Sequence, residues 1–113
     1  MEGRKKKFIE LQKVRDFIAS QLDSVVAQYR EIVKELEIKG RLTMPLAEKI
    51  SGDNLFVIRV IQTGNIRVFY VYGNDDKVYG IYGYVKKTNE IPKREMEYAV
   101  KVVKFLRQEG LIK

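Results

Sequence analysis

Residues 55–85 have the sequence LFVIRVIQTGNIRVFYVYGNDDKVYGIYGYV, and this stretch decides the fold. It contains three runs rich in β-branched and aromatic residues: Leu55–Ile61, Ile66–Tyr72 and Lys77–Val85. Short turns built from glycine, asparagine, threonine and aspartate separate the runs, as is typical of β-hairpins. The stretch therefore predicts a three-stranded antiparallel meander.

Upstream of the meander, apolar residues recur every three or four positions, the periodicity of a helix with one buried face. They fall into two groups, Val14, Phe17, Ile18 and Leu22, then Val25, Val26, Tyr29, Ile32, Val33 and Leu36. We expect two antiparallel helices joined by a tight turn near residues 20–23. Asp23 or Ser24 can cap the second helix, and Gly40 offers the left-handed stop that follows a helix.

Downstream of the meander, Pro92 can open a last helix, because its missing N–H costs nothing in the first turn. The apolar stripe of this helix is Met96, Ala99, Val100, Val103 and Leu106. Gly110 ends the helix. A short strand over Lys5–Ile9 is expected before the first helix, and Arg41–Asn54 is expected to be a connecting loop closed by a turn at residues 51–54.

The predicted order is (β)ααβββα, which is an α+β fold. It has two N-terminal helices, a small antiparallel sheet and a C-terminal helix, with the helices on one face of the sheet. The 113 residues fit a single domain, residues 1–113.

The composition excludes several kinds of chemistry. The chain has no cysteine, histidine or tryptophan, which rules out a disulfide framework, a cysteine zinc site, a thiol nucleophile and a histidine base. No apolar run reaches the roughly 18 residues of a membrane span, and Phe8–Lys13 interrupts any signal-peptide core after the basic start. We therefore expect a cytoplasmic protein with no membrane partner.

The net charge points to a polyanionic partner. Lys and Arg number 22 against 15 Asp and Glu, a formal charge of +7. Residues 55–113 hold 11 basic and 6 acidic residues, so the excess lies in the half that contains the meander. A small domain this basic commonly meets phosphates, although simple solubility would also explain the charge.

Two arginines interrupt neighbouring apolar strands. Strand alternation places Arg59 with Val57 and Ile61, and Arg67 with Phe69 and Val71. If these two faces coincide, the sheet presents two guanidinium groups, which suit forked contacts to phosphate oxygens and stacking on bases. The alternative is that each arginine extends to solvent at a sheet edge or pairs with a helix carboxylate.

A third group of cations follows the last strand. Lys86 and Lys87 leave the meander, and Lys93 and Arg94 come directly after Pro92. Three tyrosines, Tyr79, Tyr82 and Tyr84, precede them, and alternating cations and aromatic rings suit single-stranded nucleic acid. The alternative is that the tyrosines are half-buried strand residues. Lys101, Lys104 and Arg107 lie on the outer face of the last helix, as a solvated surface would.

The second half of the chain resembles a known family. The most distinctive stretch is Gly83-Tyr84-Val85-Lys86-Lys87-Thr88, which continues into Pro92–Ala99. Leu55–Val60 and Ile66–Tyr72 match as well, and the resemblance covers roughly residues 14–107. With these motifs the chain resembles the RelE/HigB-like toxins of type II toxin–antitoxin systems, especially the branch also found in phage genomes.

The resemblance implies a RelE-like domain that acts as a cytoplasmic endoribonuclease, or mRNA interferase. Such toxins usually cut mRNA in the decoding site of the ribosome and are neutralised by a cognate antitoxin protein. Two positions depart from the family pattern. Val57 stands where a Glu is common, which removes an acid/base partner, and Ile91 stands where a helix-capping Thr is common.

The residues could support cleavage of RNA without a metal ion or cofactor. The 2′-hydroxyl would attack the adjacent phosphorus, with Arg59 and Arg67 stabilising the charge of the transition state. Lys86 or Lys87 would be the base, because neighbouring cations lower the pKa of a lysine. The RNA-binding residues would be Tyr84, Lys93, Arg94 and Tyr98. The carboxylates of the turn at residues 75–76 are explained by turn chemistry, so a two-metal nuclease is not predicted.

Two other functions fit the same fold. A non-catalytic module would bind RNA, DNA or an acidic protein, and Val57 favours this alternative. A toxin of the same superfamily that acts on DNA gyrase is the other. Cleavage of transcripts separates the ribonuclease from both.

Overall fold

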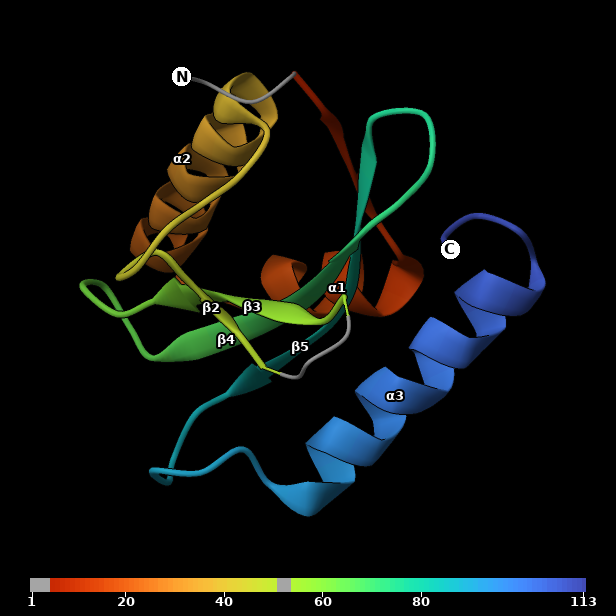
Figure 1. Cartoon of the computed structure of the whole chain (residues 1–113). Coiled ribbons are helices and arrows are strands. Elements are labelled where there is room, and N and C mark those ends of the chain that lie inside the picture. The colour runs from red at the N-terminus through yellow and green to blue at the C-terminus, as the bar shows by residue number, and fades with distance from the viewer. Residues whose placement is uncertain (1–4, 51–53) are drawn as a thin grey trace.

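The computed structural model describes residues 5–50 and 54–113; the basic start at residues 1–4 and the turn predicted at residues 51–53 lie outside them. Its elements are β1 (Lys7–Glu10), α1 (Gln12–Ala19), α2 (Asp23–Lys39), β2 (Ala47–Lys49), β3 (Phe56–Val60), β4 (Ile66–Tyr72), β5 (Lys77–Val85) and α3 (Lys93–Gln108) (Figure 1). The predicted α+β class is confirmed. None of the helices in the described ranges is long and apolar enough to cross a membrane.

The sheet has five strands in the order β1-β5-β4-β3-β2. The predicted meander is confirmed as β3–β4–β5, with antiparallel pairing throughout. The N-terminal strand also forms, at Lys7–Glu10 rather than Lys5–Ile9, but it pairs with β5 in parallel, so the sheet is mixed. The prediction that Arg41–Asn54 is only a loop is wrong, because β2 pairs antiparallel with β3. A strand of three residues is too short to show a recognisable alternation.

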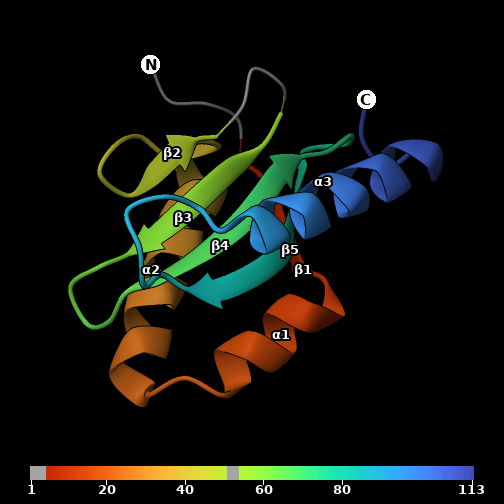
Figure 2. The same cartoon turned by 90° about the horizontal axis from the view of Figure 1, so that it is seen from below.

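Helices cover both faces of the sheet, not one face as the sequence predicted. Ile66, Val68 and Tyr70 pack in a core with α1 and α2, whereas Phe69 and Val71 pack in a second core with α3. Residues 66–71 of β4 are all buried, and a strand buried on both sides needs a layer on each. Figure 2 shows α3 crossing β4 and β5 on the side away from α2, with β2 and β3 beside it.

The helix ends agree only partly with the prediction. Gly40 follows α2 with φ 78° and Gly110 follows α3 with φ 76°, both as predicted. The capping prediction for α2 is wrong: Leu22 is the N-cap residue, and no side chain makes a capping hydrogen bond there. Leu22 is 75% exposed and Val100 is also exposed, so neither belongs to the buried stripe predicted for its helix.

A bulge in β5 sets the direction of its tyrosines. Phe69 pairs with Tyr82 but Tyr70 pairs with Gly80, so Ile81 is an extra residue between the two pairs. Bulges re-aim the side chains that follow them. As a result Tyr79, Tyr82 and Tyr84 all pack in the core beneath α3, although strict alternation would have separated the first from the other two.

Candidate nucleic-acid interface

The two strand arginines lie side by side on the α3 face of the sheet. Arg59 of β3 and Arg67 of β4 are direct cross-strand partners, on the face that also holds Val57 and Phe69. No carboxylate in the described part of the chain forms an ion pair with either guanidinium. The predicted coincidence of the two arginine faces is confirmed, and pairing with a helix carboxylate is not what holds them.

The Arg67 side chain is buried and fixed at the base of the site. It is 5% exposed, and its Nη1 donates to Asn65 Oδ1 at 3.0 Å and to the Ile66 carbonyl at 3.1 Å. Asn65 Nδ2 in turn donates to the carbonyl of Lys86 at 3.0 Å, and the Lys86 N–H donates to the Asn65 carbonyl at 2.8 Å. Asn65 therefore ties Arg67 to the first residue after β5. The sequence showed Asn65 only as a turn residue.

Arg59 is held by the segment that leads into β2. Its Nη1 donates to the Pro45 carbonyl at 3.2 Å and lies 3.8 Å from the sulfur of Met44. Its backbone N–H donates to the Leu46 carbonyl at 2.8 Å. Because β2 flanks β3, Arg59 is not at the edge of the sheet.

Two effects oppose the charge of Arg67. Burial lowers the pKa of the guanidinium, and the positive charge of Arg59 lowers it further. The negative charge of Glu48 acts in the opposite direction. An arginine keeps its charge at neutral pH even so. A bound anion between Arg59 and Arg67 would relieve their repulsion, so the pair favours a phosphate.

Tyr84 completes the row across the sheet, as the cross-strand partner of Arg67. Its ring stacks on Phe69, with centroids 5.6 Å apart, and its buried hydroxyl has no hydrogen-bond partner among the described residues. Burial raises the pKa of this hydroxyl, Arg67 opposes the rise, and the carboxylates of Glu95 and Glu48 add to it. The phenol therefore keeps its proton at neutral pH and can donate a hydrogen bond.

The segment between β5 and α3 brings two more cations to this face. Figures 1 and 2 agree that residues 86–92 project from the sheet on the side of α3. Lys87 lines a pocket of about 400 Å³ together with Tyr82, Tyr84 and Glu95. Lys86 is partly buried, and its backbone is hydrogen-bonded to Asn65. Lys87 therefore lies beside the tyrosine that adjoins Arg67, and the backbone of Lys86 is linked to Arg67 through Asn65.

The remaining predicted residues are more peripheral. Lys93 and Arg94 are exposed in the first turn of α3, and Lys93 Nζ lies 4.0 Å from Glu97. The ring of Tyr98 lies against that of Tyr82, with centroids 4.6 Å apart. Tyr98 also lines an apolar groove of about 450 Å³ between α1 and α3. The structure therefore does not bring Tyr98 to the arginine pair.

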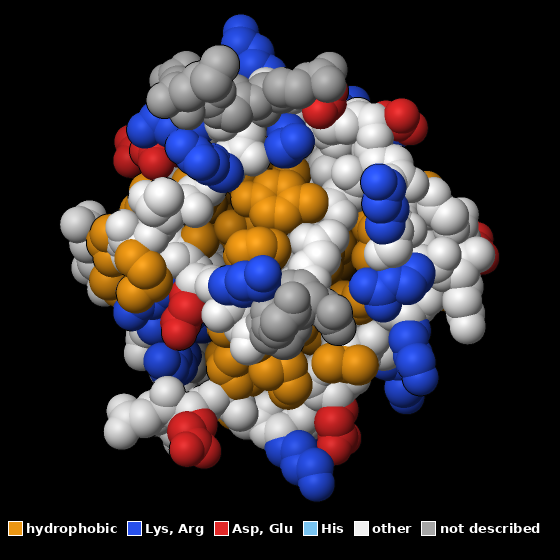
Figure 3. All heavy atoms as spheres, viewed as in Figure 1, with side chains coloured by type: hydrophobic (Ala, Val, Ile, Leu, Met, Phe, Trp, Pro, Cys, Tyr) orange, Lys and Arg blue, Asp and Glu red, His pale blue; other side chains and the backbone are white. Residues whose placement is uncertain are grey.

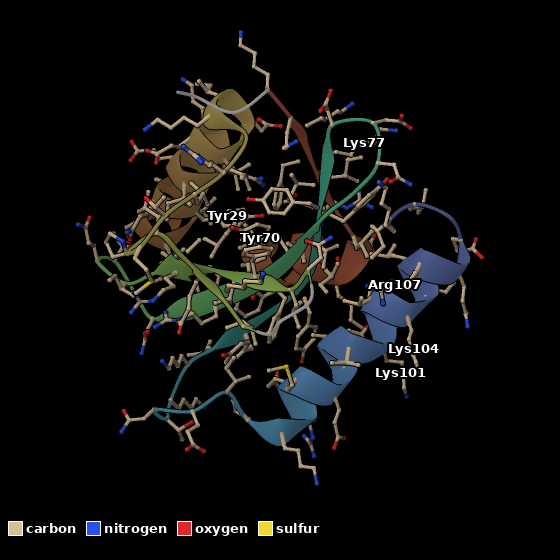
Figure 4. All side chains as sticks on the ribbon, viewed as in Figure 1. Tyr29, Tyr70, Lys77, Lys101, Lys104 and Arg107 are labelled. Carbon is tan, nitrogen blue, oxygen red and sulfur yellow. The ribbon has the colours of Figure 1, made fainter. Side chains whose placement is uncertain are left out.

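Other cations are spread over the surface. Lys101, Lys104 and Arg107 are exposed along α3, and Lys101 lines the groove between α1 and α3 (Figure 4). In the view of Figure 1, Lys and Arg side chains are dispersed with hydrophobic side chains between them (Figure 3). The α3 face of the sheet is distinguished by a buried arginine, Arg67, beside a hydrogen-bonded one, Arg59, rather than by the number of its cations.

Two glutamates near the site were not predicted. Glu95 lines the pocket beside Lys87, and one of its carboxylate oxygens is buried without a hydrogen-bond partner in the described residues. Glu48 lies on β2, which the sequence did not reveal as a strand. Within the described ranges, no group of three or more acidic side chains is arranged to hold a metal ion.

Comparison with protein families identifies a match. Residues 16–104, well over half of the chain, match the family described as phage derived protein Gp49-like. The matched range includes the arginine pair, the lysines after β5 and most of α3. No curated protein matches the chain.

Proposed function

Because this chain belongs to the Gp49-like family of phage-derived proteins, within the RelE/ParE-like toxin superfamily, we propose that it is a toxin-type endoribonuclease. It cleaves RNA without a metal ion, in the manner of the HigB-type toxins, in the cytoplasm, and a cognate antitoxin neutralises it. The observation that carries the proposal is the arginine pair: Arg59 and Arg67 are cross-strand partners with no carboxylate paired to them among the described residues.

The reaction needs charge stabilisation and alignment more than it needs a metal. When the 2′-oxygen attacks phosphorus, negative charge develops on the non-bridging oxygens, and fixed donors stabilise it most when they are already oriented. Arg67 is oriented by Asn65, and Arg59 by the Pro45 carbonyl. The Tyr84 hydroxyl adds an unused donor beside Arg67. Lys87, which lines a pocket with this tyrosine, and Lys86, whose backbone is bonded to Asn65, supply the ammonium groups that can transfer protons.

The cations around this centre suit an RNA strand, and the ribosome is the expected place of cleavage. Lys93 and Arg94, exposed at the start of α3, are placed to bind phosphates on one side of the scissile bond. Tyr82 is only partly buried beside them and can stack on a base.

The test uses purified protein and one RNA sequence in two forms, free in solution and as an mRNA on ribosomes. We expect cleavage on ribosomes, with fragments that end in a 2′,3′-cyclic phosphate and begin with a 5′-hydroxyl. The free-RNA arm includes a chelator, which should leave any cleavage unchanged. Arg67→Ala should reduce cleavage at least 100-fold, because one fixed donor to a transition-state anion contributes about that much.

Arg15→Ala is the matched control, since Arg15 is exposed on α1 and its guanidinium donates a hydrogen bond to Gln12 of the same helix, away from the arginine pair. It should cleave like the parent. If the parent protein binds RNA in both arms and yields no new ends in either, the chain is a binding module and the proposal is wrong. Gyrase inhibition with intact transcripts would contradict it as well. Equal cleavage by folded Arg67→Ala and by the parent would contradict the site.

A further inference from the structure

β2 brings a carboxylate to the face that carries the arginine pair. Glu48 is the cross-strand partner of Val57, and its neighbour Ala47 is buried in the core on the opposite face. Alternation therefore directs Glu48 to the α3 face. Arg59 is two residues further along β3 on that face, a diagonal position whose Cβ is typically about 7–8 Å away. Glu48 is exposed, so a bound strand can reach its carboxylate.

The charge of Glu48 acts on the centre of the site. Burial is the main cause that lowers the pKa of Arg67 on β4 and raises the pKa of Tyr84 on β5; the carboxylate of Glu48 opposes the first shift and adds to the second. In the described part of the chain it makes an ion pair with neither arginine. The carboxylate therefore acts on Arg67 and Tyr84 through its charge, and it is not neutralised by a salt bridge with either arginine of the pair.

We propose that Glu48 is the general base that takes the proton of the attacking 2′-hydroxyl. This inference rests on the ribonuclease function proposed above. As the proton passes to a carboxylate oxygen of Glu48, the 2′-oxygen forms its bond to phosphorus and the bond from phosphorus to the 5′-oxygen breaks. The leaving oxygen takes a proton from Lys86, Lys87 or Tyr84, which lie across the arginine pair from β2. The products are a 2′,3′-cyclic phosphate and a 5′-hydroxyl.

The position of Glu48 places the base and the acid of the reaction on opposite sides of the arginine pair. β2 lies on one side of the arginine pair, and the lysines that follow β5 lie on the other. In-line displacement needs its base and its acid on opposite sides of phosphorus. A carboxylate has no proton at neutral pH and can accept one directly, whereas a lysine must first lose its own. Lys86 and Lys87 are thereby assigned to the leaving group.

The test compares Glu48→Gln with Glu35→Gln in the cleavage assay on ribosomes. Glu35 is the matched control, because it loses the same charge on α2, where it pairs with Lys39. Glu48→Gln should cleave at least 100-fold more slowly, while it binds a 2′-O-methyl RNA at least as tightly as the parent, since a negative charge has been removed from a cationic site. Glu35→Gln should match the parent in both measurements.

A second substrate tests whether Glu48 acts as the base for the 2′-hydroxyl or as the acid for the leaving group. When the 5′-oxygen at the scissile bond is replaced by sulfur, the leaving group needs no proton. The defect of Glu48→Gln should persist on this substrate. If the defect disappears, Glu48 serves the leaving group and the assignment is wrong. It is also wrong if Glu48→Gln cleaves within threefold of the parent while Arg67→Ala does not, a result that leaves the ribonuclease function standing. A parent protein that cleaves nothing overturns both.

Discussion

Arg67 occupies a position that stability alone would not select. A guanidinium that is 5% exposed, with no carboxylate paired to it among the described residues, carries a desolvation cost that two hydrogen bonds to Asn65 and Ile66 offset only in part. Its cross-strand partner is a second arginine, which adds repulsion. Such a site becomes favourable when an anion occupies it. The residue-level chemistry therefore points to phosphate binding rather than to the structure of the sheet.

Tyr84 offers a way to separate function from stability at the same scale. Its hydroxyl is buried without a partner among the described residues, so removing it sacrifices no hydrogen bond there. Tyr84→Phe should leave the free energy of unfolding unchanged or raise it by up to about 1 kcal/mol in urea unfolding. Cleavage should fall about 100-fold, because a donor to the transition state is lost. Tyr70→Phe, on the opposite face, should cleave like the parent. A cleavage rate for Tyr84→Phe equal to that of the parent would remove this tyrosine from the site.

Among the elements, the strands of the meander could be predicted from the sequence. The faces on which their side chains lie could be predicted only in part. Runs of β-branched and aromatic residues between short turns identified β4 and β5 with correct bounds, whereas the common face of Arg59 and Arg67 follows from the pairing register. The bulge at Ile81 had no signal, because an extra residue in a strand of mixed aromatic and small residues does not disturb the local pattern. Yet this bulge is what places Tyr79 on the α3 face together with Tyr82 and Tyr84.

β2 shows why the carboxylate of the site could not be predicted. Ala47–Lys49 has no apolar alternation of its own, and it becomes a strand only because the edge of β3 is available for pairing. Val57 alone suggested a site with no acid/base carboxylate. The pairing register places Glu48 directly opposite Val57, so tertiary structure supplies what the linear pattern lacks. The lysines after β5 and the two strand arginines could be proposed as site residues without knowledge of the tertiary structure.

The contact between α1 and β5 depends on a glycine. A Cβ at Gly83 would overlap the ring of Phe17, which lines the same pocket as Lys87. Gly83→Ala should therefore lower the free energy of unfolding by about 1–3 kcal/mol, the usual cost of overpacking. The Phe17→Leu variant and the double variant complete a mutant cycle in urea unfolding. Replacing the ring should relieve much of the clash, so the cost of Gly83→Ala should be smaller in the Phe17→Leu background. An equal cost in both backgrounds would show that α1 does not meet β5 in this way.

At the scale of the whole molecule, the placement of cations matters more than the net charge of +7. Six of them, Arg59, Arg67, Lys86, Lys87, Lys93 and Arg94, lie on or beside the α3 face of the sheet or on the segment that projects from it. Lys101 and Lys104 are exposed further along the same helix as Lys93, and neither lines the pocket that holds Lys87 (Figure 4). If net charge alone attracted RNA, all of these cations would contribute alike.

The salt dependence of RNA binding distinguishes placement from net charge. Each phosphate of a single strand that is neutralised contributes about −0.7 to the slope of log K against log salt, so six contacts predict a slope of about −4. Lys93→Ala combined with Arg94→Ala should reduce the slope to about −3, because two phosphate contacts are lost. Lys101→Ala combined with Lys104→Ala makes the same change in net charge and should leave the slope unchanged. The measurement is a titration with 2′-O-methyl RNA, which cannot be cleaved, at several salt concentrations. Equal slopes for the two double variants would mean that the overall charge, and not the face around Arg59 and Arg67, binds the strand.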